Sequence, residues 1–295
     1  MTFNENANVS GSRVRRGGRG RGAAIGGGVG GLLVVVLGLV FGFDLGGLAP
    51  GDGGEPVAGD EPTSLEDCRT GADANENVEC RMQATALSLD AYWEAQLPTQ
   101  GGVAYDQPPF ELFTAQTTTA CGAASSATGP FYCPPDATVY LDVAFFDQLT
   151  SRFGASNGSL AQMYVVAHEF GHHIQNRLGT MDSIDRSGTG PTSDGVRLEL
   201  QADCYAGMWV RGAATTRDDS GVTFLEPPTR QQIADALSAA AAVGDDRIQS
   251  AAGGAVNPEA WTHGSSESRQ RWFGVGYDQG SLAACDTFAV SGSQL

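Results

Sequence analysis

The sequence predicts a mainly α-helical domain with a small β element, preceded by one transmembrane helix. Two observations lead to this fold class. Apolar residues recur at helical spacing in most segments after residue 64, whereas a single short segment has the character of a strand. Near the start of the chain, residues 24–43 form a long apolar run. The chain of 295 residues is long enough for one large domain after this run.

The apolar run predicts a membrane anchor. Residues 24–43 read AIGGGVGGLLVVVLGLVFGF, without a single charge. A helix of about 20 residues matches a hydrocarbon core of about 30 Å. Five arginines precede the run, and the positive-inside rule keeps such a flank in the cytoplasm. We therefore expect a basic cytoplasmic tail at residues 1–23, a single-pass anchor and an extracytoplasmic remainder. A cleaved signal peptide and a buried core helix are the alternatives.

The acidic composition limits the partners of the chain. Residues 44–63 are rich in Gly, Pro and acidic residues and predict a flexible linker before a domain at residues 64–295. The net charge of the chain is −17. A surface this acidic repels phosphate backbones, so no nucleic-acid partner is expected. The oligomeric state stays unknown from the sequence.

Six cysteines follow the linker. Their order suggests the pairs Cys68 with Cys80, Cys121 with Cys133, and Cys204 with Cys285. Many other connectivities exist for six cysteines, so this pairing rests on the two short spacings. Disulfides persist outside the cytoplasm, which agrees with the predicted location. A buried free thiol is the alternative for Cys204, because its segment is apolar.

Apolar periodicity predicts the regular elements of the domain. Helices are expected at residues 79–97, 145–153, 160–178, 196–211, 230–243 and 265–279, and a short strand at residues 138–142. Helix therefore dominates the domain.

The segment His168-Glu169-Phe170-Gly171-His172 has the pattern of a catalytic zinc site. Residues four apart lie on one face of a helix, so both histidines can bind one Zn²⁺ ion at about 2.0–2.1 Å. Glu169 can take a proton from the attacking water and return it to the leaving amine. The apolar flanks at helical spacing place the motif on a helix, and Gly171 is expected to leave room beside the ion. The motif therefore indicates a metal-dependent hydrolase.

A catalytic zinc usually has three protein ligands, so a third one is needed. The metzincin pattern requires Gly and His where this chain has Gln175 and Leu178, which excludes that class. Glu199 and Asp203 stand four apart on a second predicted helix. Glu199 can supply the third ligand, and Asp203 can accept the outer N–H of a zinc-bound histidine. A solvated helix face is the alternative for this pair, but the helix is mostly apolar.

The remaining polar candidates are weaker. His263 could stabilise the negative oxygen that forms when water attacks a carbonyl, and a histidine at a helix entry is the alternative. Asp245 and Asp246 follow a glycine and are expected to cap a helix. His173 points about 100° away from His172 on the helix, so we expect it to be packed or solvated.

Several segments together resemble the neutral zinc metallopeptidase family of bacteria. They are AHEFGHHIQ, RLELQADCYAGMW, ACGAASSATGPFYCPPDATVYLDVAFF, GDDRIQ and THGSSESRQRWF. The resemblance extends over about residues 65–290. It implies a membrane-anchored protein with a zincin-like domain, in which His168 and His172 bind zinc and Glu169 is the catalytic acid/base. Glu199 as third ligand follows from similarity to glutamate-ligated zincins.

The resemblance also implies where a substrate would lie. A peptide can add to the edge of a zincin sheet, and we expect residues 131–135 to form that edge. The sequence favours a membrane-anchored, extracytoplasmic zinc-dependent peptidase, acting on a peptide or protein with Glu169 as general base. The alternative is a non-catalytic, zinc-stabilised scaffold or interaction protein of the cell envelope. A zinc hydrolase of non-peptide bonds also stays open.

Overall fold

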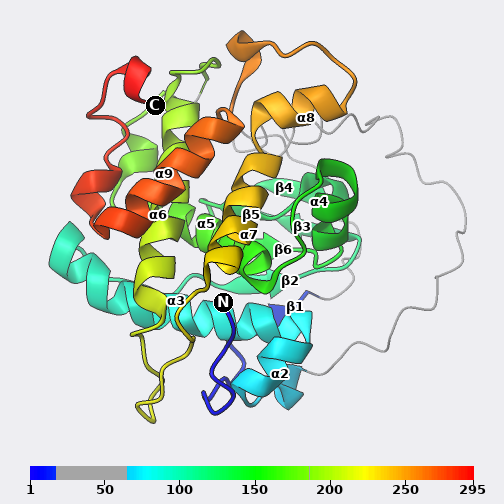
Figure 1. Ribbon diagram of the computed structural model, residues 1–295, viewed down its shortest axis with the longest axis vertical. Coiled ribbons are helices and arrows are strands. Elements are labelled where there is room, and N and C mark those ends of the chain that lie inside the picture. Colours follow the sequence, from blue (N-terminus) through cyan, green and yellow to red (C-terminus); the bar gives the residue numbers. More distant parts are fainter. Residues whose placement is uncertain (18–64, 186) are drawn as a thin grey trace, which may run out of the picture.

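The computed structural model describes residues 1–17, 65–185 and 187–295 (Figure 1). Its helices are α2 (Gly71–Glu76), α3 (Val78–Gly101), α4 (Phe145–Phe153), α5 (Ser159–Arg177), α6 (Asp194–Ala213), α7 (Arg230–Ala242), α8 (Asp245–Ala251) and α9 (Ser266–Gln279). Its strands are β1 (Val14–Arg16), β2 (Phe110–Leu112), β3 (Gln116–Thr119), β4 (Gly122–Ser125), β5 (Phe131–Cys133) and β6 (Thr138–Leu141). The mainly helical class is confirmed.

The β element is larger than the sequence predicted. Four strands form one sheet in the order β1-β2-β6-β5, in which β1, β2 and β6 run parallel and β5 runs antiparallel to β6. Strands β3 and β4 form a separate antiparallel hairpin. Strand β6 was predicted from its apolar, β-branched residues, and residues 131–135 were expected at a sheet edge, where β5 lies. The other strands, of three or four residues, show no clear alternation.

All six predicted helices are present. Their ends shift by a few residues where a cap decides the boundary: α3 begins after Asn77, whose side chain accepts the backbone N–H groups of Glu79 and Cys80. Helices α2 and α8 were missed because they are short. The two aspartates after Gly244 begin α8, but neither caps it. This part of the prediction is corrected, since Asp245 and Asp246 bind the segment at residues 262–266 instead.

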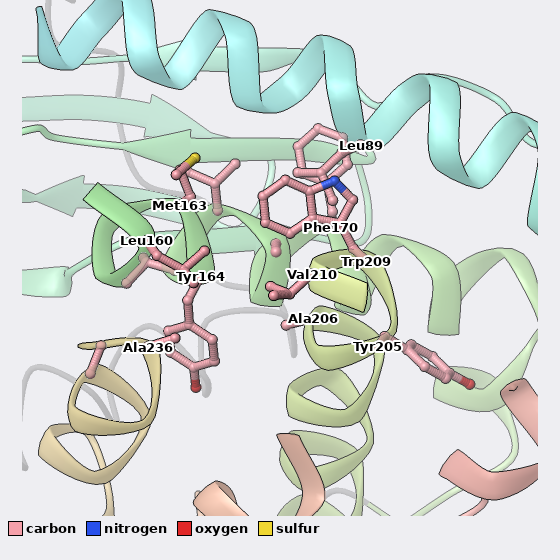
Figure 2. Close-up of a cluster of buried hydrophobic side chains, with 14 of the residues drawn as sticks. Leu89, Leu160, Met163, Tyr164, Phe170, Tyr205, Ala206, Trp209, Val210 and Ala236 are labelled. Atoms are coloured by element: carbon pink, nitrogen blue, oxygen red, sulfur yellow. The ribbon is translucent and has the colours of Figure 1, made fainter. Parts of the chain in front are cut away.

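The core surrounds α5, which packs against α6 and α7 and also contacts α3 and β5. Figure 2 shows Leu89 of α3, Phe170 of α5 and Trp209 of α6 gathered in this core, all of them fully buried. Ala236 brings the apolar face of α7 to the same cluster. The central helix of the fold is therefore the one that carries His168 and His172.

Three disulfides brace the domain, and the predicted pairing is confirmed. Cys68 is bonded to Cys80, Cys121 to Cys133 and Cys204 to Cys285. The third bond ties α6 to the C-terminal segment. The interpretation of Cys204 as a free thiol was wrong.

The N-terminal segment differs from the predicted cytoplasmic tail. The predicted transmembrane helix at residues 24–43 and the linker at residues 44–63 lie outside the described residues. Within the described ranges, no helix combines the length and apolarity that a membrane crossing needs. Residues 1–17 pack into the domain: Phe3 and Val14 are buried in its core, and β1 forms the edge of the main sheet. The arginines of this segment led to the prediction of a tail, and its apolar residues were not considered as core positions.

Helices α6 and α9 pack closely, and a glycine makes this possible. A Cβ atom built on Gly276 of α9 would lie 1.8 Å from the carbonyl oxygen of Cys204 in α6. No side chain fits in this space, so the two backbones touch. Gly274 lies on the same helix but has no atom within 4 Å of its would-be Cβ.

Replacing Gly276 with alanine should lower the free energy of unfolding by about 1–3 kcal/mol or more, because the helices must separate. Urea denaturation followed by circular dichroism measures this change. The matched variant Gly274→Ala should be neutral or up to about 1 kcal/mol more stable, since alanine favours helix. Equal stability of the two variants would contradict the backbone contact.

Candidate metal centre

Helices α5 and α6 bring the candidate ligands face to face. The approach occurs at Gly171, where an added Cβ atom would lie 3.0 Å from both the Cα and the carbonyl oxygen of Ala202. The sequence suggested that this glycine leaves room beside an ion, but the room is taken by the backbone of α6. Gly171 therefore sets the distance between the two histidines of α5 and the two carboxylates of α6.

His168, His172 and Glu199 converge on one point. Nε2 of His168 lies 3.1 Å from one Glu199 carboxylate oxygen, and Nε2 of His172 lies 3.4 Å from the other. One ligand atom from each residue falls within 4.8 Å of the other two. Two imidazoles and one carboxylate are one of the donor sets found in catalytic zinc sites, so these three residues fit a zinc ion.

Acceptors on the far side of both rings fix the histidine tautomers. The Asp203 carboxylate lies 2.9 Å from Nδ1 of His168, and the Gln175 side-chain oxygen lies 2.8 Å from Nδ1 of His172. The Gln175 amide nitrogen donates to the carbonyl of Leu198 at 2.6 Å, which turns its oxygen toward His172. Each Nδ1 therefore carries the proton in the neutral ring, and each Nε2 directs its lone pair toward the point where a metal would bind.

Asp203 is held by two further residues. Arg269 of α9 donates from Nε at 2.7 Å to one carboxylate oxygen and from Nη2 at 3.0 Å to the other. The Tyr164 hydroxyl also donates to Asp203. Asp203 is fully buried and Arg269 is 2% exposed, so the pair is shielded from water. This network joins α5, α6 and α9 behind His168.

The sequence predicted four residues of this cluster and missed the roles of Gln175, Arg269 and Tyr164. Gln175 was used only to exclude the metzincin pattern, although it stands one turn after His172 on the predicted helix. Arg269 lies in a quoted motif but was given no role. The sequence around Arg269 did contain a signal. Trp272 and Phe273 follow Arg269 at helical spacing and are buried with it. An arginine on such an apolar helix face needs a carboxylate partner.

The surrounding carboxylates favour positive charge at His168. Burial lowers the pKa of His168, but the carboxylates of Asp203 and Glu199 outweigh this effect and raise it to about 10. Burial likewise raises the pKa of Glu199, yet His172 and His168 hold it well below its usual range. The metal-free protein thus has a preference for a cation at this point, and a divalent metal ion would satisfy it.

Glu169 faces the same cluster but is not one of the three convergent ligands. Burial raises the pKa of its carboxyl group, and the neighbouring His168 and His172 partly offset the rise. Its side chain has no hydrogen-bond partner among the described residues, although the residue is only 7% exposed. Its oxygens are not among the fully buried side-chain atoms that lack a partner, so solvent reaches this carboxyl group.

His263 is paired with Asp245 beside this cluster. One Asp245 oxygen lies 3.1 Å from Nδ1 of His263, and the other accepts the backbone N–H groups of residues 262–264. The loop rests on α6 next to Glu199, since a Cβ atom added to Gly264 would touch Val196 and Leu200. Burial lowers the pKa of His263, but Asp245 and Glu199 raise it above its ordinary value. The sequence did not predict the Asp245 partner.

His173 takes no part in the cluster, as predicted. Its Nε2 donates to the carbonyl of Asp106 at 2.7 Å, and its Nδ1 lies 3.1 Å from the Tyr132 hydroxyl. Burial lowers its pKa to about 4, so the ring is neutral. It is therefore a packed residue that ties α5 to the sheet.

Replacing Asp203 with asparagine should weaken zinc binding about 10–100-fold, because the carboxylate that orients His168 is lost. Competition with a chelator of known affinity measures the change.

A matched control exists in the same chain. Asp90 is also a buried carboxylate held by an arginine, Arg13, and by a tyrosine hydroxyl, Tyr105 at 2.6 Å, but it has no histidine partner. Asp90→Asn should destabilise the fold without changing zinc affinity. Equal zinc affinity in both variants would contradict the orienting role of Asp203.

Comparison with known proteins places this sequence in a family. The sequence model of the family described as "Putative neutral zinc metallopeptidase" matches residues 2–288. Uncharacterized protein Rv2575 of Mycobacterium tuberculosis is 53% identical over 228 residues, which cover 77% of this chain and 76% of that protein. Uncharacterized protein YpfJ of Escherichia coli K12 is 37% identical over 299 residues, covering 97% of each chain. No solved structure matches. The chain belongs to this zinc metallopeptidase family.

Proposed function

We propose that the chain is a zinc-dependent peptidase with His168, His172 and Glu199 as zinc ligands. The observation that carries the proposal is the convergence of two Nε2 atoms and one carboxylate, with both outer ring nitrogens held by acceptors. Membership of a zinc metallopeptidase family supports it.

In this proposal each residue has a separate task. Zinc bound to the three ligands supplies Lewis acidity, which makes water more acidic and a carbonyl more electrophilic. Glu169 takes the proton of the attacking water and delivers it to the leaving amine. The burial that raises its pKa brings this carboxyl group closer to the working pH of a general base.

Glu169 also favours catalysis over a scaffold role. A zinc-stabilised scaffold needs the ligands and Asp203, but it has no task for a carboxyl group beside both ligand histidines that forms no hydrogen bond among the described residues. A group placed in this way suits proton transfer.

We assign His263 to the oxygen that becomes negative when the carbonyl is attacked. Asp245 accepts the Nδ1 proton of His263 and favours the charged ring, which leaves Nε2–H as a donor beside Glu199. Donors placed in this way stabilise the transition state more than the substrate. Asp245 is then a positioning residue for His263.

A peptide substrate is proposed to pair with β5. This strand is the antiparallel edge of the main sheet, and it packs against α5. Addition of a strand at such an edge gives main-chain hydrogen bonds that do not depend on the substrate sequence.

We propose that the domain works outside the cytoplasm, in contact with the membrane. Three disulfides persist in an oxidising compartment and are rare in a reducing one. The uncharged residues 24–43 are the proposed membrane attachment.

Replacing Glu169 with glutamine should reduce peptide cleavage by about 10²–10⁴-fold while zinc stays bound, because only the general base is removed. Incubation with a diverse peptide mixture, read by mass spectrometry, measures cleavage, and elemental analysis measures zinc.

The exposed Glu267 of α9 provides the control, since Glu267→Gln removes a carboxylate of the same size outside the cluster. This variant should cleave like the wild type, and a chelator should stop both. Wild-type cleavage by Glu169→Gln would overturn the assignment of the general base.

A further inference from the structure

The first 17 residues are an integral part of the domain fold. Strand β1 pairs in parallel with β2, from Val14 opposite Phe110 to Arg16 opposite Leu112. Phe3 forms an antiparallel bridge with Leu225, and Asn8 forms one with Thr70. Met1, Phe3, Ala7, Val9 and Val14 all have exposed fractions of 2% or less. These residues alternate with exposed ones and fill one side of the core.

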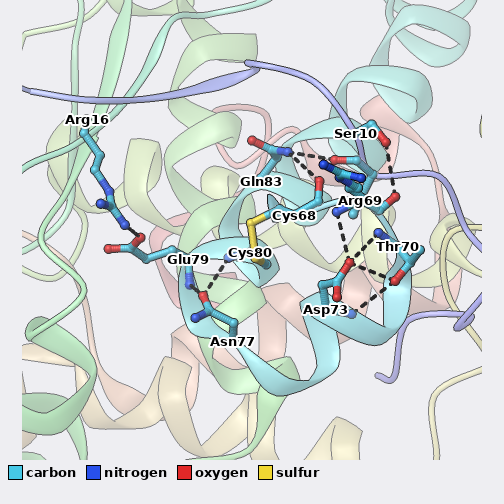
Figure 3. The surroundings of a disulfide bond; sticks show 11 residues. Ser10, Arg16, Cys68, Arg69, Thr70, Asp73, Asn77, Glu79, Cys80 and Gln83 are labelled. Carbon is cyan, nitrogen blue, oxygen red and sulfur yellow. Dashed lines mark hydrogen bonds and ion pairs between the residues drawn. A yellow bond between two sulfur atoms is a disulfide. The ribbon is translucent and has the colours of Figure 1, made fainter. Parts of the chain in front are cut away.

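Polar contacts anchor the same segment to distant parts of the domain. The Gln83 amide donates to the carbonyls of Val9 at 2.7 Å and of Cys68 at 3.4 Å, beside the Cys68–Cys80 disulfide (Figure 3). The backbone N–H of Asn8 donates to Asp218 at 2.7 Å. Arg13 forms a two-pronged ion pair with Asp90, and Arg16 pairs with Glu79 (Figure 3).

The domain needs these contacts. Without Arg13, the Asp90 carboxylate, which is 3% exposed, would be a buried charge without a counter-ion. Without Val9, the Gln83 amide would lose its closest acceptor inside the core. The arginines that precede the apolar run are thus partly engaged in the domain, and their charge is not a simple signal for the cytoplasmic side.

This packing conflicts with a single membrane crossing between the two parts. If residues 24–43 crossed the membrane once, residues 1–23 would lie on one side and residues 44–295 on the other. None of the contacts above could then form. A second helical crossing cannot be supplied by residues 44–63, which contain five acidic residues and no long apolar run.

We infer that residues 1–17 and 65–295 lie on the same side of any membrane that the chain contacts, because the two parts pack into one fold. This inference rests on the contacts of residues 1–17 and is independent of the proposed zinc chemistry.

Single cysteines on each part of the full-length chain test the inference. Ser12 lies in the N-terminal segment and Ala255 in the loop after α8, and both are exposed. All six native cysteines are in disulfides, so the wild type is the unlabelled control. Ser12→Cys and Ala255→Cys are expressed separately, and spheroplasts are treated with a membrane-impermeant maleimide before and after permeabilisation.

Both variants should react to the same extent in intact spheroplasts. If one reacts there and the other only after permeabilisation, the two parts lie on opposite sides and the inference is overturned. If both react only after permeabilisation, the shared side is the cytoplasm: the inference stands, and the proposed extracytoplasmic location fails. The test therefore separates the topology from the proposed function.

Discussion

The close contact of α5 with α6 at Gly171 is the constraint on which the site depends. A helix with two histidines four residues apart can direct both rings to one side, but it cannot complete a three-ligand site alone. The second helix must come near enough for Glu199 to reach both rings, and the missing side chain at Gly171 allows this approach to Ala202. Asp203, one turn after Glu199, then meets the outer nitrogen of His168. The two histidines of α5 and the two carboxylates of α6 can meet in one site only when the helices lie this close together.

The chain uses one arrangement of side chains twice. Asp203 is held by Arg269 and Tyr164, and Asp90 is held by Arg13 and Tyr105. Only the first has a histidine as a further partner, and it lies behind the candidate ligands. The second joins the N-terminal segment to α3. One buried ion pair thus lies behind a candidate ligand histidine, and the other holds the N-terminal segment against α3.

Much of the site could be predicted because its residues follow helical spacing. His168 and His172, and Glu199 and Asp203, are each four apart on apolar helices, which is unusual for solvated residues. Arg269, Gln175 and Asp245 were missed because their partners come from other elements, and no local pattern reports such contacts.

The short strands gave too few residues for a periodic signal. Strand β1 of the N-terminal segment was not predicted, for a different reason. Arg13 and Arg16 resemble a cytoplasmic flank in the sequence, whereas in the fold they neutralise Asp90 and Glu79. The net charge of a segment takes no account of such partners. The positive charge of residues 1–17 therefore predicted a tail and gave no indication of strand β1.

The metal content of the purified protein tests the central claim most directly. Elemental mass spectrometry should find one zinc per wild-type chain, and Glu199→Ala should lose most of it while remaining folded, because only two histidines are then left to bind the ion. A folded Glu199→Ala protein that retains zinc with wild-type affinity would show that the ion, if bound, is held elsewhere, and would contradict the site described for α5 and α6.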